Sequence, residues 1–99
     1  MDLEKLRSVV QYYKDHLIDM GVNPKEFTNE QYENPTTGYP LLQHCRWMLN
    51  KMEEYLHPDN VTTDLMNKSF RWIGYVQGSL GALQIFAVKQ LRDHSRSPL

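Results

Sequence analysis

The chain has 99 residues, of which 40% are hydrophobic and 23% charged, a composition typical of a single globular domain and not of a disordered segment. The formal net charge of -1 argues against a DNA-binding protein, which would carry a basic surface. Cys45 is the only cysteine, which excludes an internal disulfide and fits a reducing compartment. No apolar run approaches the roughly 18 residues of a membrane span, and no secretory signal is visible. We therefore expect a cytosolic protein with neither DNA nor membrane as a partner.

The first twenty residues show the periodicity of an amphipathic helix. Apolar side chains recur every three or four residues, which places them on one helical face, and Gly21 marks the end of the pattern. They are Leu3, Leu6, Val10, Tyr13, Leu17 and Met20. Tyr13 belongs to this stripe, so its neighbour Tyr12 should face another direction. The pattern predicts an N-terminal helix over residues 1–20.

Residues 21–40 have the composition of a loop. Glycine and proline interrupt the segment at Gly21, Pro24, Pro35, Gly38 and Pro40, and such residues mark turns. A connector of this length in a short chain is usually functional. We expect residues 21–40 to form a loop that contributes to a binding site.

Residues 41–96 have the pattern of a long antiparallel helical hairpin. A helix is predicted from about Leu41 to Leu56, a tight turn follows at residues 57–60, and a second long helix runs from Thr63 to at least Leu83. Residues 84–96 either continue that helix or kink into a further one. No strand is indicated. The prediction is an all-α single domain over residues 1–99.

Three glycines punctuate the second hairpin helix. Gly74, Gly78 and Gly81 lie at i, i+4 and i+7, so they form one smooth groove on the helix surface. Each glycine inside a helix costs about 1 kcal/mol relative to alanine. We expect another backbone to pack tightly along this groove.

The hairpin sequence resembles a phage protein family. The string Arg-Trp-Ile-Gly-Tyr-Val-Gln-Gly at residues 71–78, the segment from His44 to Met48 and the segment from Gln90 to Arg96 resemble the anti-CBASS cyclic-nucleotide sponge family. Its hairpin is shared with a family of Thoeris anti-defence sponges. The resemblance covers about residues 41–96 and implies a compact homo-oligomer, a hexamer. Such a protein sequesters cyclic dinucleotides such as cyclic GMP-AMP (cGAMP), and in some members cyclic trinucleotides, in the host bacterial cytoplasm.

The resemblance also implies binding residues. A tyrosine of the N-terminal helix, with a lysine and a threonine of the following loop, grips the dinucleotide in the family; Tyr12, Lys25 and Thr28 match them. Alternatively, Tyr12 packs at a subunit contact while Lys25 and Thr28 are solvated loop residues with a cap. Arg71 matches an arginine of the trinucleotide site, and its alternative role is a surface salt bridge to Asp64 or to another acid.

Catalytic residues are not apparent in the sequence. His44 and Cys45 are adjacent, so on a helix they point about 100° apart and do not form a nucleophile–base pair. The four histidines lack the spacing of metal ligands, so neither a metal nor another cofactor is expected. For the cyclic nucleotide that the resemblance implies as ligand, this absence favours binding without cleavage. The alternative is a helical interaction module that inhibits a host protein directly.

Two positions depart from the family pattern. Gln84 stands where the family has a glycine after the long helix, and Ala87 stands where the family has a threonine that caps the last helix. Both concern the junction between the long helix and residues 84–96.

Overall fold

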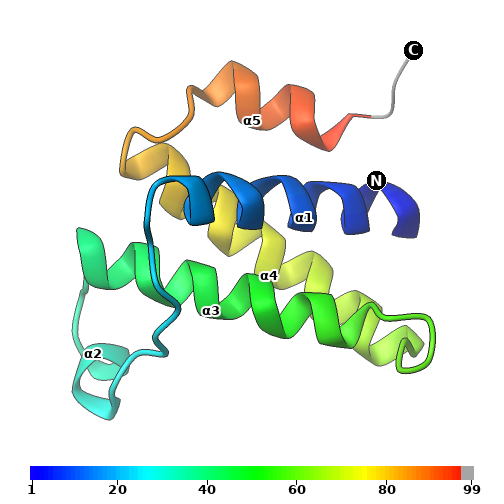
Figure 1. The fold of residues 1–99 in the computed structure, drawn as a ribbon, viewed down its shortest axis with the longest axis horizontal. Helices are drawn as coiled ribbons and strands as arrows, with labels where there is room; N and C mark the ends of the chain where they lie inside the picture. The colour runs from blue at the N-terminus through cyan, green and yellow to red at the C-terminus, as the bar shows by residue number, and fades with distance from the viewer. Residues whose placement is uncertain (97–99) are drawn as a thin grey trace.

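The computed structural model describes residues 1–96, and all of its regular structure is helical, as expected (Figure 1). The five helices are α1 (Leu3–Asp19), α2 (Asn29–Glu33), α3 (Tyr39–Tyr55), α4 (Thr63–Ala82) and α5 (Val88–Ser95). The described part of the chain contains no strand. None of its helices combines the length and the apolar character that crossing a bilayer requires.

Helix α1 begins where the sequence offers a cap and buries the predicted face. Asp2 accepts a hydrogen bond from the Lys5 amide at 2.7 Å, which satisfies one of the free amides at a helix start. Tyr13 is fully buried, whereas Tyr12 is 50% exposed. The prediction that these neighbours face different ways is confirmed.

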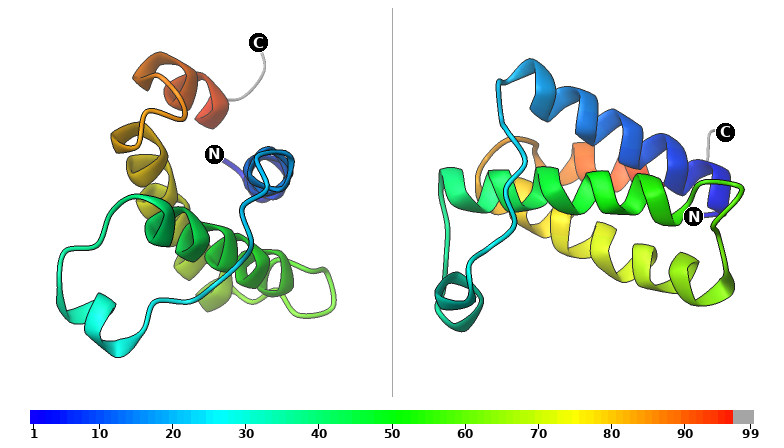
Figure 2. Two further views of the ribbon diagram at one scale, coloured as in Figure 1. Left: turned by 60° about the vertical axis from the view of Figure 1, so that its left-hand side comes forward. Right: turned by 60° about the horizontal axis from the view of Figure 1, so that its bottom comes forward.

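Helices α3 and α4 form the most extensive helix–helix contact of the fold. They are joined by the turn at residues 56–62 and lie side by side in opposite directions (Figures 1 and 2). Helix α1 packs on α3 and, less extensively, on α4. The side chains between these three helices are the apolar ones that recur at helical spacing, including Leu6, Leu17, Cys45, Leu49, Met52, Val76 and Leu80. Burying such faces is the main source of stability in a small helical domain.

The connector at residues 21–40 differs from the expected loop because it contains the short helix α2. Thr28 Oγ1 accepts a hydrogen bond from the Gln31 amide at 3.2 Å, and Gln31 Oε1 accepts one from the Thr28 amide at 2.9 Å. This reciprocal pair is a capping box, a common start of a helix. Helix α3 also begins earlier than expected, at Tyr39, with Pro40 in its first turn, where proline is well tolerated.

The junction after α4 resolves the alternative left open for residues 84–96: the chain turns and forms a separate helix. Gln84 adopts a left-handed backbone with φ of 62°, the conformation in which many helices end. Gln90 Oε1 accepts a hydrogen bond from the Ala87 amide at 2.8 Å, so α5 starts without a threonine cap. Helix α5 then lies beside α1 and α4 (Figure 2).

Replacing Gln84 by glycine is expected to stabilise the protein by about 1 kcal/mol. A left-handed conformation costs an ordinary L-residue roughly 1–2 kcal/mol and glycine almost nothing, while the added freedom of glycine in the unfolded chain offsets part of the gain. Urea denaturation followed by circular dichroism measures the change. Ala82→Gly, at the last residue of the same helix, is the control and should destabilise. A Gln84→Gly variant no more stable than the parent would contradict the strain assigned to this turn.

A partly buried polar network ties α5 to the rest of the fold. The Tyr13 hydroxyl lies 2.9 Å from His94 Nδ1 and accepts a hydrogen bond from Gln77 Nε2 at 3.1 Å. Gln77 Nε2 also donates to Ser95 Oγ at 2.7 Å. Burial, with a smaller contribution from Lys5, lowers the pKa of His94, which favours the neutral ring beside the Tyr13 hydroxyl. These contacts join α1, α4 and α5.

Within the chain, the predicted close packing along the glycine groove is wrong for two of its three residues. A Cβ atom at Gly74 or Gly78 would meet nothing within 4 Å, whereas one at Gly81 would lie 3.0 Å from Leu91 Cδ1. Helix α5 therefore covers only the C-terminal end of the groove. The rest of it is exposed on α4.

Candidate functional site

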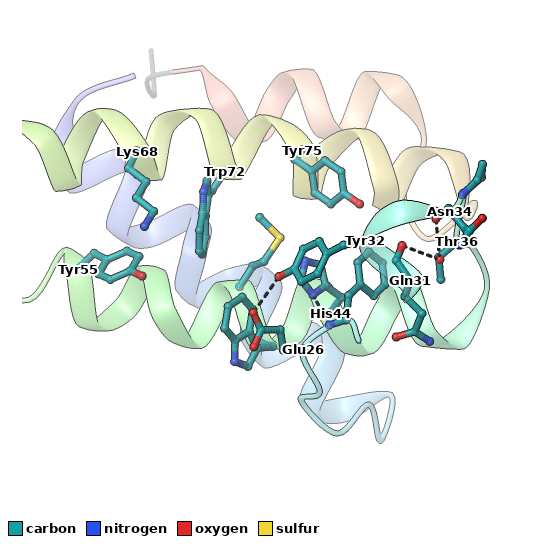
Figure 3. Close-up of a pocket in the computed structure, with 14 residues that line it drawn as sticks. Glu26, Gln31, Tyr32, Asn34, Thr36, His44, Tyr55, Lys68, Trp72 and Tyr75 are labelled. Atoms are coloured by element: carbon teal, nitrogen blue, oxygen red, sulfur yellow. Dashed lines mark hydrogen bonds between the residues drawn. The ribbon is translucent and has the colours of Figure 1, made fainter. Parts of the chain in front are cut away.

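An aromatic cleft lies between the segment of residues 26–36 and the pair α3 and α4 (Figure 3). Its volume is about 800 Å³, within the range of small-molecule sites. Both tryptophans of the chain line it. Its rings are those of Phe27, Tyr32, His44, Trp47, Tyr55, Trp72 and Tyr75, and its charged side chains are Glu26 and Lys68. We call this region the aromatic cleft.

His44 holds the connector against α3 and so forms the floor of the aromatic cleft. Its ring stacks on Phe27 with centroids 3.9 Å apart and planes 4° apart. The Trp47 ring is also stacked with the His44 ring, with centroids 5.4 Å apart. The Phe27 amide donates a hydrogen bond to His44 Nδ1 at 3.0 Å. Burial lowers the pKa of His44, so the ring is neutral and, with Nδ1 as acceptor, carries its proton on Nε2.

Lys68 contributes a positive charge at one end of the aromatic cleft. Its ammonium lies 4.8 Å from the Tyr55 ring centroid and 4.9 Å from the Trp72 ring centroid, within the distance of cation–π attraction. Figure 3 shows these three side chains together. No ion pair between residues 1–96 includes Lys68. The aromatic faces hold the ammonium without neutralising it, so its charge is available to an anion.

Glu26 and Tyr32 contribute a polar pair to the same cleft. The Tyr32 hydroxyl donates a hydrogen bond to Glu26 Oε2 at 2.9 Å. Burial, followed by the hydrogen bond and the negative charge of Glu26, raises the pKa of Tyr32 to about 12. The hydroxyl therefore keeps its proton at neutral pH. One oxygen of the carboxylate is engaged by Tyr32, and the other has no hydrogen-bond donor among the described residues.

The sequence-predicted residues lie outside the aromatic cleft. Tyr12 is on the outer face of α1, its ring centroid 4.9 Å from that of His94, and it borders a small hollow of about 210 Å³. Lys25 is exposed just before α2. The Thr28 hydroxyl caps α2. No hydrogen bond or ion pair in the described chain links Tyr12 to Lys25 or Thr28.

Arg71 is exposed on α4. The alternative salt bridge to Asp64 is not among the ion pairs of residues 1–96. In those residues no group of three or more histidine, cysteine or acidic side chains is placed to hold a metal ion. Cys45 is fully buried, and burial raises the pKa of its thiol to about 11.

Sequence reasoning did not assign Glu26, Trp47, Tyr55, Lys68 or Trp72 to a binding site. A signal for the aromatic cleft was present. Trp47 and Tyr55 lie two turns apart on α3, and Lys68 and Trp72 lie one turn apart on α4, so each pair shares a helical face. What the sequence lacked was evidence that the two faces meet.

Comparisons of the chain with protein-family models, with curated proteins and with solved structures found no match.

Proposed function

We propose that this protein binds cyclic oligonucleotide second messengers and holds them intact, as the resemblance of residues 41–96 implies. In this proposal it is a phage anti-defence protein in the host bacterial cytoplasm. It sequesters cyclic dinucleotides such as cGAMP, and cyclic trinucleotides at a separate site near Arg71, and so prevents activation of the CBASS effector. The working form is a homo-oligomer, a hexamer of the helical hairpin.

The observation that carries the proposal is the uncovered glycine groove on α4. Gly74 and Gly78 belong to the string at residues 71–78 and face open space within the protomer. Two such glycines cost about 2 kcal/mol of helix stability, and no contact within the protomer requires them. Their small size suits a close approach by the backbone of a second copy. Such a contact supports the assembly on which the sponge function depends.

An oligomer also accounts for the separation of the predicted binding residues. Tyr12, Lys25 and Thr28 are all exposed, yet one protomer does not join them in one site. Nanomolar binding requires about 12 kcal/mol, while a stacked base supplies about 1–3 kcal/mol and a hydrogen bond to a charged group about 1.5–3 kcal/mol. A pocket shared by two copies offers twice the number of groups and can meet this requirement.

Binding without cleavage has a direct test. The protein is incubated with cGAMP, denatured by heat, and the released nucleotide is identified by chromatography. Intact cGAMP is expected, and a linear or hydrolysed product would replace the proposal with an enzymatic one. A ligand at 100 times its Kd should raise the free energy of unfolding by about 2.7 kcal/mol. A thermal melt with cyclic di- and trinucleotides that shows no such shift would leave the direct inhibition of a host protein as the better hypothesis.

The same melt tests the predicted site. Lys25→Ala removes a proposed phosphate contact and should weaken binding of cGAMP at least tenfold, whereas Lys89→Ala on α5 should not. Equal affinities of the Lys25→Ala variant and the parent would remove Lys25 from the site.

A further inference from the structure

We propose that the aromatic cleft is a guanine-nucleotide site in which a guanine base stacks on the partly exposed indole rings, Glu26 binds the Watson–Crick donors of the base, and Lys68 binds the phosphate. The cleft is distinct from the surface that carries Tyr12, Lys25 and Thr28. The choice of a nucleotide as ligand class rests on the proposed function, which the inference deepens by giving one site a base preference.

The aromatic rings of the cleft form a surface suited to a planar ligand. Trp47 and Trp72 lie with centroids 6.0 Å apart and planes tilted by 32°, too close to admit a ring between them. A base must therefore stack against their outer surface, within the 800 Å³ of the cleft. Stacking of a base on an aromatic side chain contributes about 1–3 kcal/mol. The rings alone accept any base, so they set affinity and not base preference.

The carboxylate of Glu26 provides the discrimination between bases. Guanine presents two adjacent donors, N1–H and N2–H, on its Watson–Crick edge, whereas adenine presents one donor beside the acceptor N1. A carboxylate accepts hydrogen bonds and donates none. Tyr32 engages Glu26 Oε2, which leaves Oε1 and the second lone pair of Oε2 for the base. Charge-assisted bonds of this kind are about twice as strong as neutral ones, so guanine is favoured over adenine.

Lys68 provides the complementary charge for the phosphate. Its partly buried ammonium lies over the Tyr55 and Trp72 rings and retains donors for an anion, since a ring face uses the charge without accepting all three N–H groups. Figure 3 shows Lys68 beside Trp72 and Tyr55, apart from Glu26, which lies close to Tyr32. The phosphate and the base edge thus meet groups of opposite charge at different places, which fixes the orientation of the ligand.

Tryptophan fluorescence reports on this cleft alone, because Trp47 and Trp72 are the only tryptophans of the chain and both line it. The full chain is titrated with GMP, AMP, cyclic di-GMP and cyclic di-AMP, with calorimetry on the same samples. The two guanine ligands are expected to quench the emission and to bind at least tenfold more tightly than their adenine counterparts. Glu26→Gln, which keeps the size and the Tyr32 contact, should abolish that preference. Lys68→Met should weaken the binding of all four ligands at least tenfold.

Matched controls lie outside the cleft. Glu30→Gln on α2 and Lys89→Met on α5 make the same chemical changes and should leave the quenching unchanged. If calorimetry detects binding of a nucleotide while the tryptophan emission stays constant, the cleft is not the binding site, and the sponge proposal still stands. Quenching by GMP with no response to any cyclic nucleotide would support the cleft and overturn the sponge. Tryptophan emission that changes with protein concentration but not with any added nucleotide would overturn the inference, because another copy of the chain then covers the cleft.

Discussion

Replacing Gly74 and Gly78 together by alanine is expected to raise the free energy of unfolding of the isolated protomer by about 2 kcal/mol. A new Cβ at either position meets nothing within 4 Å, so the helix propensity of alanine is gained without a clash. For a domain of this size the midpoint of thermal unfolding should rise by about 4–8 °C for each kcal/mol. Urea denaturation at a dilution where the parent is monomeric measures the change.

Gly81→Ala is the matched control on the same helix. Its Cβ would lie 3.0 Å from Leu91 Cδ1, so α5 must shift and the gain should be smaller or absent. At higher protein concentration the double variant tests whether the groove is an open surface or a contact between two copies of the chain. If a second copy packs its backbone there, sedimentation should show that the variant, although more stable as a monomer, no longer assembles. A double variant that gains no stability would contradict the open groove, and one that assembles as the parent does would remove the groove from the subunit contact.

His44→Ala is expected to destabilise the protein by about 2–4 kcal/mol and to open the aromatic cleft. The change removes a ring that stacks with both Phe27 and Trp47, and aromatic pairs contribute about 0.5–1.5 kcal/mol beyond their buried area. It also leaves the Phe27 amide without its acceptor, at a cost of about 1–3 kcal/mol if that amide stays buried. Urea denaturation measures the loss of stability, and tryptophan emission should shift to longer wavelength as water reaches the cleft.

His44→Asn separates the hydrogen bond from the ring. The Asn side-chain oxygen is an acceptor placed much as Nδ1 is in histidine, so this variant should recover about 1 kcal/mol relative to alanine while the stacking stays lost. Equal stabilities of the two variants would show that the Phe27 hydrogen bond does not hold the connector. A destabilised protein with unchanged emission would show that His44 does not shape the cleft.

The sequence by itself determined the three long helices α1, α3 and α4 and their buried faces. Tyr13 and Leu17 could be assigned to the core and Tyr12 to the surface from spacing alone, because an α-helix places residues three and four apart on one face whatever surrounds it. The short helix α2 was missed because glycine and proline at the ends of the connector hid the local signal of Thr28 and Gln31. Whether the chain continues as one helix past residue 83 could not be decided from the sequence, because Gln84 stands where a glycine would normally indicate a left-handed turn.

Only the tertiary structure decided what these faces meet. It showed that Gly74 and Gly78 are uncovered while Gly81 lies against α5, and it brought Glu26, Trp47 and Lys68 to one cleft from three separate segments. Helical periodicity describes the direction of each side chain relative to its own helix axis. It contains no information on how one helix is rotated or shifted against the next, and that arrangement follows from packing across the whole core.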